Sequence, residues 1–378
     1  MQGQKGKKVF VGMSGGVDSS VAAMLMRDRG YDVAGVFMRS YNLDGCADRD
    51  AEDARRVAEA LGIPFYVWDF EEEYKQRVVD YMIEGYRAGM TPNPDVRCNK
   101  EIKFGLFLER ALAAGADYVA TGHYVRLMDG VRSDGHDGGA RLFEAVDGNK
   151  DQSYFLWTLT GAQLAHCLFP IGDYRKPEVR AMARVADLPT AEKKDSQGIC
   201  FLGMVDLDAF LKRHIPSRRG ALITTAGEKI GEHSGAEFVT IGERHLRADF
   251  SFPKTGVARA RKPFYVAAKD TATNVVTVAE GSDHPALYRK EVSLDQVHFI
   301  GGDSLVAPVC RAAAGDAAPL RVRARVRYRE PLSDAALSRL DDGRYRLAFD
   351  EPRKFVASGQ SAVFYGADGE MLGGGIII

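Results

Sequence analysis

The chain has 378 residues, of which 45% are hydrophobic and 27% charged, and its formal net charge is −1. This composition is ordinary for a globular protein, the length predicts two or three domains, and a charge so close to zero indicates no class of partner. No stretch reaches the about 18 uninterrupted apolar residues of a membrane span, and the N-terminal "MQGQKGKK" lacks the apolar core of a signal peptide. We therefore expect a cytoplasmic protein without a membrane partner.

The first half of the chain alternates strand and helix patterns. In chain order the periodicity predicts strands at 7–13, 31–40, 65–70 and 116–124, and helices at 19–30, 48–62, 72–89 and 99–115. Strands joined by helices of this length form right-handed crossovers, so we expect an α/β fold with a doubly wound parallel sheet. Because ligands bind at the carboxyl ends of such strands, the loops that follow them should surround one crevice. These loops follow Met13, Met38, Phe70 and Thr121.

The pattern changes after residue 214. Short strands separated by Gly, Pro and Asp turns replace the strand–helix alternation, first as a small β-rich region and then, from residue 286, as the strands of a β-barrel. We therefore expect three domains. They are an α/β domain at 1–214, a central β-rich domain at 215–285 and a C-terminal β-barrel domain at 286–378.

The segment "VFVGMSGGVDSS" joins the first predicted strand to the first helix. Gly15 and Gly16 allow positive φ and close backbone approach, so successive N–H groups at the positive end of the helix can face one anion. Ser14 and Ser19 add hydroxyl donors, and Asp18 adds a carboxylate for capping the helix or meeting Mg²⁺. No Lys stands where a Walker A loop requires one. We interpret the segment as a phosphate-binding turn; a tight turn before a serine-capped helix is the alternative.

The five cysteines are irregularly spaced and form no C-x-x-C pair, which argues against a disulfide framework and a zinc ribbon. Cys98 follows Asp95 by three residues in "MTPNPDVRCNKEIKFG", where we expect it to open the next helix. A helix N-terminus favours a thiolate, so Cys98 is a candidate nucleophile rather than a small apolar core residue. Cys200, after a polar loop, is the second candidate. The others are Cys46, whose role is open, and Cys167 and Cys310, which lie in apolar contexts.

The loop S-G-G-x-D-S resembles the PP-loop of ATP pyrophosphatases, which bind ATP, adenylate a carbonyl oxygen and release pyrophosphate. The cysteine segments "NPDVRCN" and "SQGICFLG" are similar to those of the tRNA-specific 2-thiouridylases, the MnmA-type family that makes 2-thiouridine at the tRNA wobble position. Further matching stretches are "GVFMRSY", "ATGHY", "NKDQSYFL", "GDYRKPEVR" and "GQSAVFYGADGEMLGGGIII". The resemblance spans essentially the whole chain and implies a tRNA-uridine 2-sulfurtransferase with its catalytic domain at 1–214.

This resemblance implies that the uracil 2-oxygen attacks the α-phosphate of ATP while Mg²⁺ neutralises the leaving pyrophosphate. A persulfide on Cys200 would supply the sulfur, and Cys98 would break the S–S bond or release sulfide, leaving a disulfide between the two. Asp95 would be the acid or base, and which sulfur attacks C2 stays open. His123 is either a catalytic base or a polar group lining the nucleotide site. The implied ATP-binding residues are Gly12, Met13, Ser14, Gly15, Gly16, Val17, Asp18, Ser19, Met38 and Gly122, with Asp18 as a candidate for Mg²⁺.

The segment "RVRARVRYR" carries arginines at 321, 323, 325, 327 and 329. On one strand all five would share a face suited to an RNA backbone; a solvated outer face of a barrel strand is the alternative. By resemblance the tRNA contacts are Lys150, Asp151, Gln152, Arg327 and Tyr328, with Asn93, Pro94 and Asp95 around a flipped target base. The implied partners are tRNAs with Lys, Glu and Gln anticodons and a sulfur-relay protein or cysteine desulfurase, and not DNA.

Other functions fit parts of the sequence. Another PP-loop ligase would need the ATP loop but neither Cys98 nor Cys200, and an amidating synthetase would need an ammonia source, for which no segment is apparent. An iron–sulfur-dependent thiolase would use the same two cysteines as cluster ligands. A non-catalytic RNA-binding or sulfur-carrier protein would not need an intact S-G-G-x-D-S. The family's basic, glycine-rich segment after "TIG" is replaced here, so we expect different tRNA contacts at 243–262.

Overall fold

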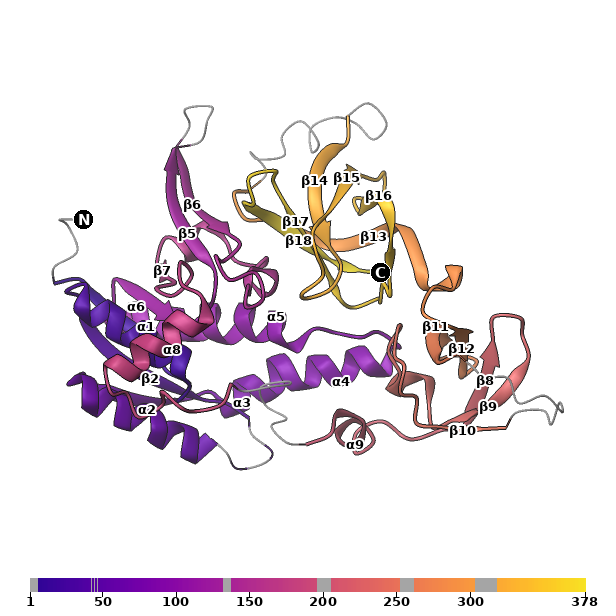
Figure 1. Cartoon of the computed structure of the whole chain (residues 1–378), viewed down its shortest axis with the longest axis horizontal. Helices are drawn as coiled ribbons and strands as arrows, with labels where there is room; N and C mark the ends of the chain where they lie inside the picture. The colour runs from indigo at the N-terminus through magenta and orange to yellow at the C-terminus, as the bar shows by residue number, and fades with distance from the viewer. Residues whose placement is uncertain are drawn as a thin grey trace.

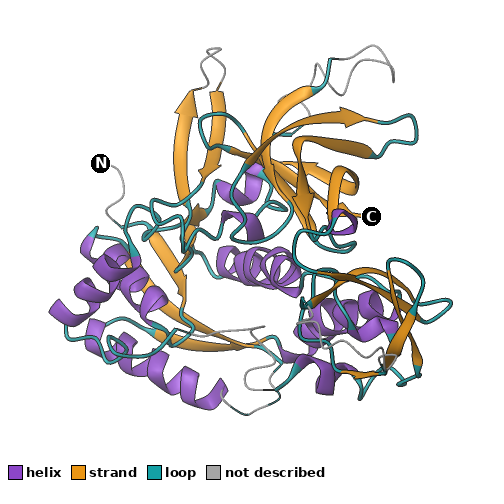
Figure 2. Ribbon diagram, turned by 45° about the vertical axis from the view of Figure 1, so that its right-hand side comes forward, coloured by secondary structure: helices purple, strands orange, loops and turns teal. Residues whose placement is uncertain are grey.

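The computed structural model describes residues 6–41, 43, 45, 47–131, 137–195, 205–251, 262–302 and 318–378. The described chain contains four sheets: a parallel sheet in an α/β domain, a central sheet, a closed barrel and a two-stranded hairpin. Figure 1 shows the first at the left, the central sheet at the lower right and the barrel above it. Most helices gather around the first sheet, whereas the central domain and the barrel are mainly strands (Figure 2). Within these ranges no helix has the length and apolar character needed to span a bilayer.

The first sheet has the order β3-β2-β1-β4-β7, and every pair in it is parallel. Its strands are β3 (Phe65–Asp69), β2 (Asp32–Arg39), β1 (Lys8–Gly12), β4 (Tyr118–Thr121) and β7 (Cys167–Leu168). Because all strands run the same way, the loops after β1, β2, β3 and β4 leave from one edge, as the sequence predicted. The expected doubly wound α/β fold is confirmed.

Helices cover both faces of this sheet. Along β1, Val9 and Val11 point into a core shared with α1, α2 and α8, whereas Phe10 points into the opposite core with α4 and α6. This follows from the alternation of side chains along a strand. The helices are α1 (Val17–Asp28), α2 (Ala47–Leu61), α3 (Glu71–Tyr74), the π-helix η1 (Lys75–Val79), α4 (Asp80–Arg87), α5 (Pro94–Cys98), the π-helix η2 (Asn99–Leu106), α6 (Phe107–Ala113), the 3-10 turn η3 (Ser153–Phe155), α7 (Gly161–Leu164), α8 (Lys176–Val185) and α9 (Leu207–Leu211).

The helix that carries Cys98 differs from its prediction. It begins at Pro94 with Asn93 as N-cap, and α5 continues through η2 into α6 with helical φ and ψ at each junction. The prediction that Cys98 opens the helix is therefore wrong: Cys98 lies a full turn inside it. Proline fits the first turn because its missing N–H has no helical partner there. Prolines at 92 and 94 are equally compatible with an irregular loop, so the sequence alone does not show this helix start.

The central sheet has the order β10-β9-β8-β12-β11, and β13-β16-β15-β14-β17-β18 close into the expected barrel. The central elements are β8 (Gly220–Thr224), β9 (Lys229–His233), η4 (Ala236–Phe238), β10 (Ala248–Phe250), β11 (Phe264–Asp270), β12 (Val275–Glu280) and η5 (Pro285–Leu287). The barrel strands are β13 (Tyr288–Phe299), β14 (Leu320–Arg325), β15 (Ser333–Arg339), β16 (Tyr345–Lys354), β17 (Ser361–Tyr365) and β18 (Met371–Ile377). A hairpin of β5 (Arg126–Val131) and β6 (Asp137–Phe143) stands beside the barrel and meets it through a bridge between Phe143 and Glu370.

The predicted arginine stripe is only partly formed. Strand β14 ends at Arg325, and residues 326–329 form a bend and a turn, with Arg329 at φ +64°. Arg325 is only 5% exposed, whereas Arg321 is exposed and pairs with Asp350 at 2.7 Å. The prediction of five arginines on one strand face is therefore wrong, because the chain leaves the strand before Arg327. Periodicity alone does not show where a strand stops.

Candidate active site

The segment between β1 and α1 forms the predicted turn. Gly16 is the N-cap of α1, so the N–H groups of the first helical turn have no partner within the helix. Gly15 has φ +71°, and a Cβ there would lie 2.3 Å from the carbonyl oxygen of Asp50. Only glycine combines this backbone conformation with this close approach. The turn therefore presents open N–H donors at the positive end of a helix, which is an anion-binding arrangement.

The serine hydroxyls hold the shape of this turn. The Oγ of Ser19 accepts a hydrogen bond from the backbone N–H of Ser14 at 3.1 Å and donates to the carbonyl oxygen of Gly16 at 3.1 Å. Ser20 also donates to the Gly16 carbonyl, at 2.8 Å, and accepts from Thr190 at 2.9 Å. Ser19 and Ser20 are buried, whereas Ser14 is exposed. Of these hydroxyl groups, that of Ser14 is the one placed to meet a ligand.

Met38 and Gly122 lie beside this segment, and their predicted place around the adenine and ribose of ATP stays a prediction. A Cβ on Gly12 would lie 2.9 Å from the Cε of Met38 at the end of β2. A Cβ on Gly122, just after β4, would lie 2.7 Å from the backbone carbon of Asp18 and from the backbone nitrogen of Ser19. The structure thus gathers the residues of the predicted ATP site at the carboxyl edge of β1, β2 and β4.

A chain of charges starts from Asp18. Its carboxylate accepts hydrogen bonds from Lys176 Nζ at 2.8 and 2.9 Å and from the Tyr124 hydroxyl at 2.8 Å. Lys176 also contacts Asp195 at 2.8 Å, and Asp195 contacts Lys150 at 2.6 Å and Arg180 at 2.9 Å. Burial alone would raise the pKa of Asp195, but hydrogen bonds from Lys150 and Lys176 outweigh it and lower the pKa to about 2. Two lysines are thereby held beside the phosphate-binding turn.

Sequence reasoning gave Lys176, Tyr124 and Asp195 no role. Lys176 is only 9% exposed and is the first residue of α8, with a proline after it. A lysine is rarely buried unless it is paired, and a proline marks a helix start. The string "RKPEVR" therefore indicated a paired lysine at a helix start, but only the fold brings this lysine to the turn between β1 and α1.

His123 lies in an apolar environment. Its Nδ1 is 2.8 Å from the Oγ1 of Thr121, and its ring packs beside Phe104 and Phe169. Burial, with a smaller contribution from Lys103, lowers the pKa of His123 well below its ordinary value. The imidazole is therefore neutral at neutral pH and is chiefly a packed side chain beside the turn.

This burial predicts a pH dependence of stability. The unfolded chain binds a proton on His123 near pH 6.5 and the folded chain does not, so acidification below that pH favours unfolding. We expect the free energy of unfolding to fall by up to about 1.4 kcal/mol per pH unit from this group. The thermal unfolding temperature, measured between about pH 7.5 and 5.5, should fall less steeply for His123→Gln than for the unmodified chain. Equal slopes for the two chains would show that His123 keeps its ordinary pKa.

Asp95 and Cys98 share one side of the α5 helix, since residues three apart are neighbours on a helix. The side-chain oxygen of Asn93 accepts from the backbone N–H of Val96 at 3.2 Å and so caps the helix. Burial raises the pKa of Asp95, and Lys103 partly offsets this rise. A carboxyl group with a raised pKa is suited to proton transfer. Cys98 is 6% exposed, and the dipole favours a thiolate less there than in the first turn.

Three of the five cysteines lie outside the described residues: Cys46, Cys200 and Cys310. The predicted pairing of Cys98 with Cys200 is therefore not described. Asp195, the hub of the lysine contacts, is the last described residue before Cys200. The predicted role of Cys200 stays a prediction.

Cys167 has a structural environment. It lies in β7, is 1% exposed, and its Sγ donates to the Gln163 carbonyl oxygen at 3.1 Å. Burial raises the pKa of the Cys167 thiol, so little thiolate forms. We expect iodoacetamide to leave Cys167 unmodified in the folded chain and to modify it fully in urea, as measured by peptide mass spectrometry. Rapid modification of the folded chain would show that this thiol is accessible.

The predicted tRNA contacts divide into two groups. Arg327 is exposed, with its guanidinium 5.4 Å from the ring centre of Phe355, and Tyr328 packs on Phe155 with ring centres 4.4 Å apart. Asp151 is 3% exposed and points into the protein, which leaves its carboxylate almost no surface for an RNA contact. Gln152 and Lys150 are likewise engaged with protein groups, through bonds to Tyr124 and Asp195.

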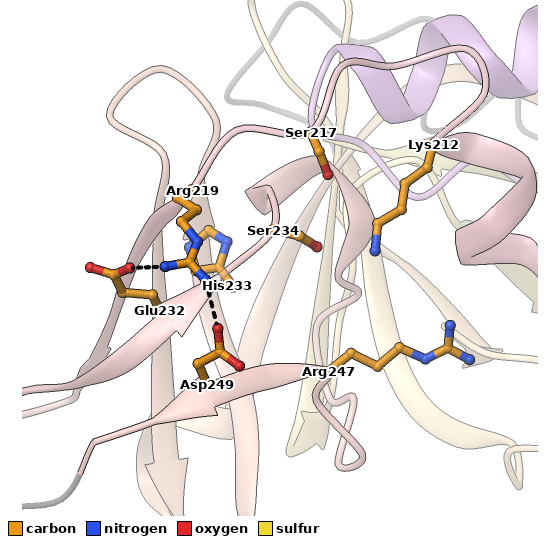
Figure 3. A pocket seen from close by; sticks show the side chains of 8 residues that line it. All are labelled: Lys212, Ser217, Arg219, Glu232, His233, Ser234, Arg247 and Asp249. Carbon is orange, nitrogen blue, oxygen red and sulfur yellow. Dashed lines mark hydrogen bonds and ion pairs between the residues drawn. The ribbon is translucent and has the colours of Figure 1, made fainter.

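A separate pocket of about 370 Å³ lies in the central sheet (Figure 3). Its lining side chains are Lys212, Ser217, Arg219, Glu232, His233, Ser234, Arg247 and Asp249. Arg219 contacts Glu232 at 3.3 Å and Asp249 at 3.0 Å, and Arg247 contacts Asp206 at 2.8 Å. These cations are matched by carboxylates, and Arg219 and Asp249 are largely exposed, so the pairs are screened and weak.

The parallel sheet and its phosphate-binding turn define the class of ATP-utilising PP-loop proteins. Family models match three successive parts of the chain: a tRNA methyl transferase HUP domain at 7–204, a tRNA methyl transferase PRC-barrel domain at 208–280 and an aminomethyltransferase beta-barrel domain at 292–377. The chain is 44% identical to the tRNA-specific 2-thiouridylase MnmA of Pseudomonas paraeruginosa over 98% of its length and 94% of that protein. The chain belongs to the tRNA-specific 2-thiouridylase family.

Two further relatives support the same family. The tRNA-specific 2-thiouridylase MnmA of Proteus mirabilis is 44% identical, with 98% of this chain and 97% of that protein covered. That of Geobacillus thermodenitrificans is 43% identical, with 98% and 94% covered. The family expected from the motifs is thus confirmed over almost the whole chain.

Proposed function

We propose that this chain is an ATP-dependent tRNA-uridine 2-sulfurtransferase. The observation that supports it most is that the phosphate-binding turn and the Cys98 helix meet. A Cβ on Gly12 would lie 3.6 Å from Phe107, which continues the helix of Cys98. At about 1.5 Å per residue, Cys98 is about 14 Å along the helix axis from that contact. The helix that carries Cys98 therefore packs against the end of β1, next to the predicted ATP site. The relatives named as 2-thiouridylases indicate RNA as the substrate class.

ATP would bind with its phosphates on Gly12–Ser19. The open N–H groups at the start of α1 would donate to phosphate oxygens, and Lys176 and Lys150 would add positive charge. Mg²⁺ commonly binds substrate phosphates with one or two carboxylates, and Asp18 is a carboxylate at this position. Asp18 would hold the ion in exchange for its bonds to Lys176. When bound, Mg²⁺ would neutralise charge on the leaving pyrophosphate.

The sulfur chemistry would use two cysteines. After the uracil 2-oxygen has displaced pyrophosphate from the α-phosphate, the terminal sulfur of a Cys200 persulfide would attack C2 and AMP would leave. The Cys98 thiolate would then attack the Cys200 sulfur, breaking the S–S bond to give 2-thiouridine and a Cys98–Cys200 disulfide. A reductant would restore both thiols. Asp95, with its raised pKa, would take or return a proton near Cys98.

The tRNA would meet Arg327 and Tyr328 on the barrel and Asn93, Pro94 and Asp95 at the start of α5. The exposed guanidinium of Arg327 suits a phosphate, and a flipped uridine requires a polar pocket. Lys150 would contact phosphate of either substrate. The RNA partners would be tRNAs with Lys, Glu and Gln anticodons, with a persulfide donor protein as sulfur source and the cytoplasm as compartment.

The test is anaerobic thiolation of unmodified tRNA for Lys, Glu and Gln with ATP, Mg²⁺ and a protein-bound persulfide. Nucleosides are resolved by mass spectrometry, pyrophosphate is measured in parallel, and the protein is analysed for iron. Formation of 2-thiouridine by iron-free protein supports the proposal. Pyrophosphate release without thiolation would keep the ATP reaction and overturn the persulfide route; activity only with bound iron would favour a cluster-dependent thiolase. Neither product with folded tRNA would overturn the proposed function.

A further inference from the structure

Four consecutive residues, 150–153, connect the ATP turn to the barrel. Their side chains alternate: Lys150 and Gln152 contact groups beside the ATP turn, whereas Asp151 and Ser153 contact groups of the barrel. Asp151 and Ser153 are almost fully buried. The segment is not a strand: Lys150 ends a turn, Gln152 has φ −116° and ψ 8°, and Ser153 begins η3, so the local backbone fold sets these directions.

On the ATP side the contacts lead directly to Asp18. The backbone N–H of Tyr124 donates to the side chain of Gln152 at 3.0 Å, and the backbone N–H of Gln152 donates to the carbonyl oxygen of Tyr124 at 2.9 Å. This paired contact fixes Tyr124, whose hydroxyl donates to Asp18 at 2.8 Å. Lys150 reaches Asp195, which shares Lys176 with Asp18. A shift of this segment would therefore move groups at the phosphate-binding turn.

On the barrel side the anchor is Arg325, the last residue of β14. Its guanidinium pairs with Glu144, lies 3.4 Å from Asp151 and sits 4.9 Å from the ring centre of Tyr365. The Asp151 carboxylate also accepts from the Ala145 backbone N–H at 3.0 Å and from the Ser153 hydroxyl at 2.9 Å. The same hydroxyl lies 2.8 Å from the Tyr365 hydroxyl. A buried guanidinium is always charged, so it holds its carboxylate partners strongly in place.

We propose that Arg325 is a positioning residue for the ATP site: from the barrel it fixes Asp151, and through residues 150–153 it fixes Tyr124 and Lys150 beside the ATP turn. This inference rests on the proposed ATP site. Arg325 stands two residues before Arg327, and Tyr328 packs on Phe155 just after the connecting segment. RNA bound at Arg327 and Tyr328 would therefore act on the same segment, and the affinities for ATP and tRNA would be coupled reciprocally.

The experiment compares ATP binding to the full chain by equilibrium dialysis in Mg²⁺, with and without unmodified tRNA. The test variant is Arg325→Met, and the matched control is Arg141→Gln. Like Arg325, Arg141 connects the barrel to neighbouring structure: it pairs with Glu370 and, at 3.3 Å, with Asp368. Among its described contacts there is no ion pair with residues 150–153. We expect Arg325→Met to weaken ATP binding by about 5- to 10-fold and to reduce its response to tRNA, and the control to change it less than about 2-fold.

Further variants separate positioning from loss of folding. Tyr365→Phe deletes only the hydroxyl that meets Ser153 and should weaken ATP binding in the same direction by a smaller factor. In a double-mutant cycle, Asp151→Asn should add little to Arg325→Met, because both break one contact. Unchanged ATP affinity in folded Arg325→Met and Tyr365→Phe, or loss of tRNA affinity alone, would overturn the inference. If the unmodified chain binds no ATP, the proposed ATP site fails instead.

Discussion

Replacement of Cys98 by alanine is expected to lower tRNA thiolation by at least about 10³-fold, the scale for removal of a reacting nucleophile. The ATP turn does not depend on this sulfur, so tRNA-dependent pyrophosphate release should continue at a comparable rate. The reason is that different elements carry the two steps. The proposed phosphate site lies between β1 and α1, whereas Cys98 lies on a separate helix that packs beside them. Thiolated nucleoside and pyrophosphate are measured in the same reaction.

The matched control is Cys167→Ala, which makes the same substitution at a different buried cysteine, in β7. Both variants are checked for folding by circular dichroism and thermal unfolding. We expect Cys167→Ala to retain thiolation within about 2-fold, because its raised pKa keeps the thiol protonated and unreactive. Full thiolation by folded Cys98→Ala would remove Cys98 from the reaction and leave the sulfur transfer to Cys200 alone.

Gly122→Ala is expected to reduce activity by about 10²-fold, since misplacing reacting groups by about 1 Å has an effect of this size. A methyl group at position 122 would stand 2.7 Å from the backbone of both Asp18 and Ser19, and backbone atoms cannot swing away as a side chain can. The start of α1 would have to move, and the N–H groups that face the phosphates would move with it. The expected signature is a raised KM for ATP with an unchanged Kd for tRNA.

Gly161→Ala is the control for this substitution. Gly161 begins α7, and its nearest neighbour would be the Ile300 carbonyl oxygen at 3.6 Å, an ordinary van der Waals distance. This variant should keep the KM for ATP of the unmodified chain. If Gly122→Ala also keeps that KM while it folds normally, the close contact with Asp18 does not position the ATP turn.

The sequence by itself determined the parallel sheet, the phosphate turn and the barrel. Each depends on local patterns: the alternation of Val9, Phe10 and Val11, the glycines that permit the turn, and the change to short strands after residue 214. These local patterns predict the fold well because each helix or strand buries the face on which its own apolar residues recur. The sequence predicted the first and last residues of helices and strands less well, because contacts with neighbouring elements decide them. The helix start at Pro94 and the strand end at Arg325 are examples.

Only the tertiary structure decided which charges meet. Lys176 is 158 residues from Asp18 in the chain, and Arg325 is 181 residues from Glu144, yet both pairs are in direct contact. No periodicity encodes such partners, because they are selected by the packing of the barrel and of α8 against the first sheet. Burial then fixes the pairing, since a charge removed from water requires an opposite charge or hydrogen bonds. For this reason Arg325, which the sequence predicted on an RNA-facing stripe, is buried and pairs with Glu144 and Asp151.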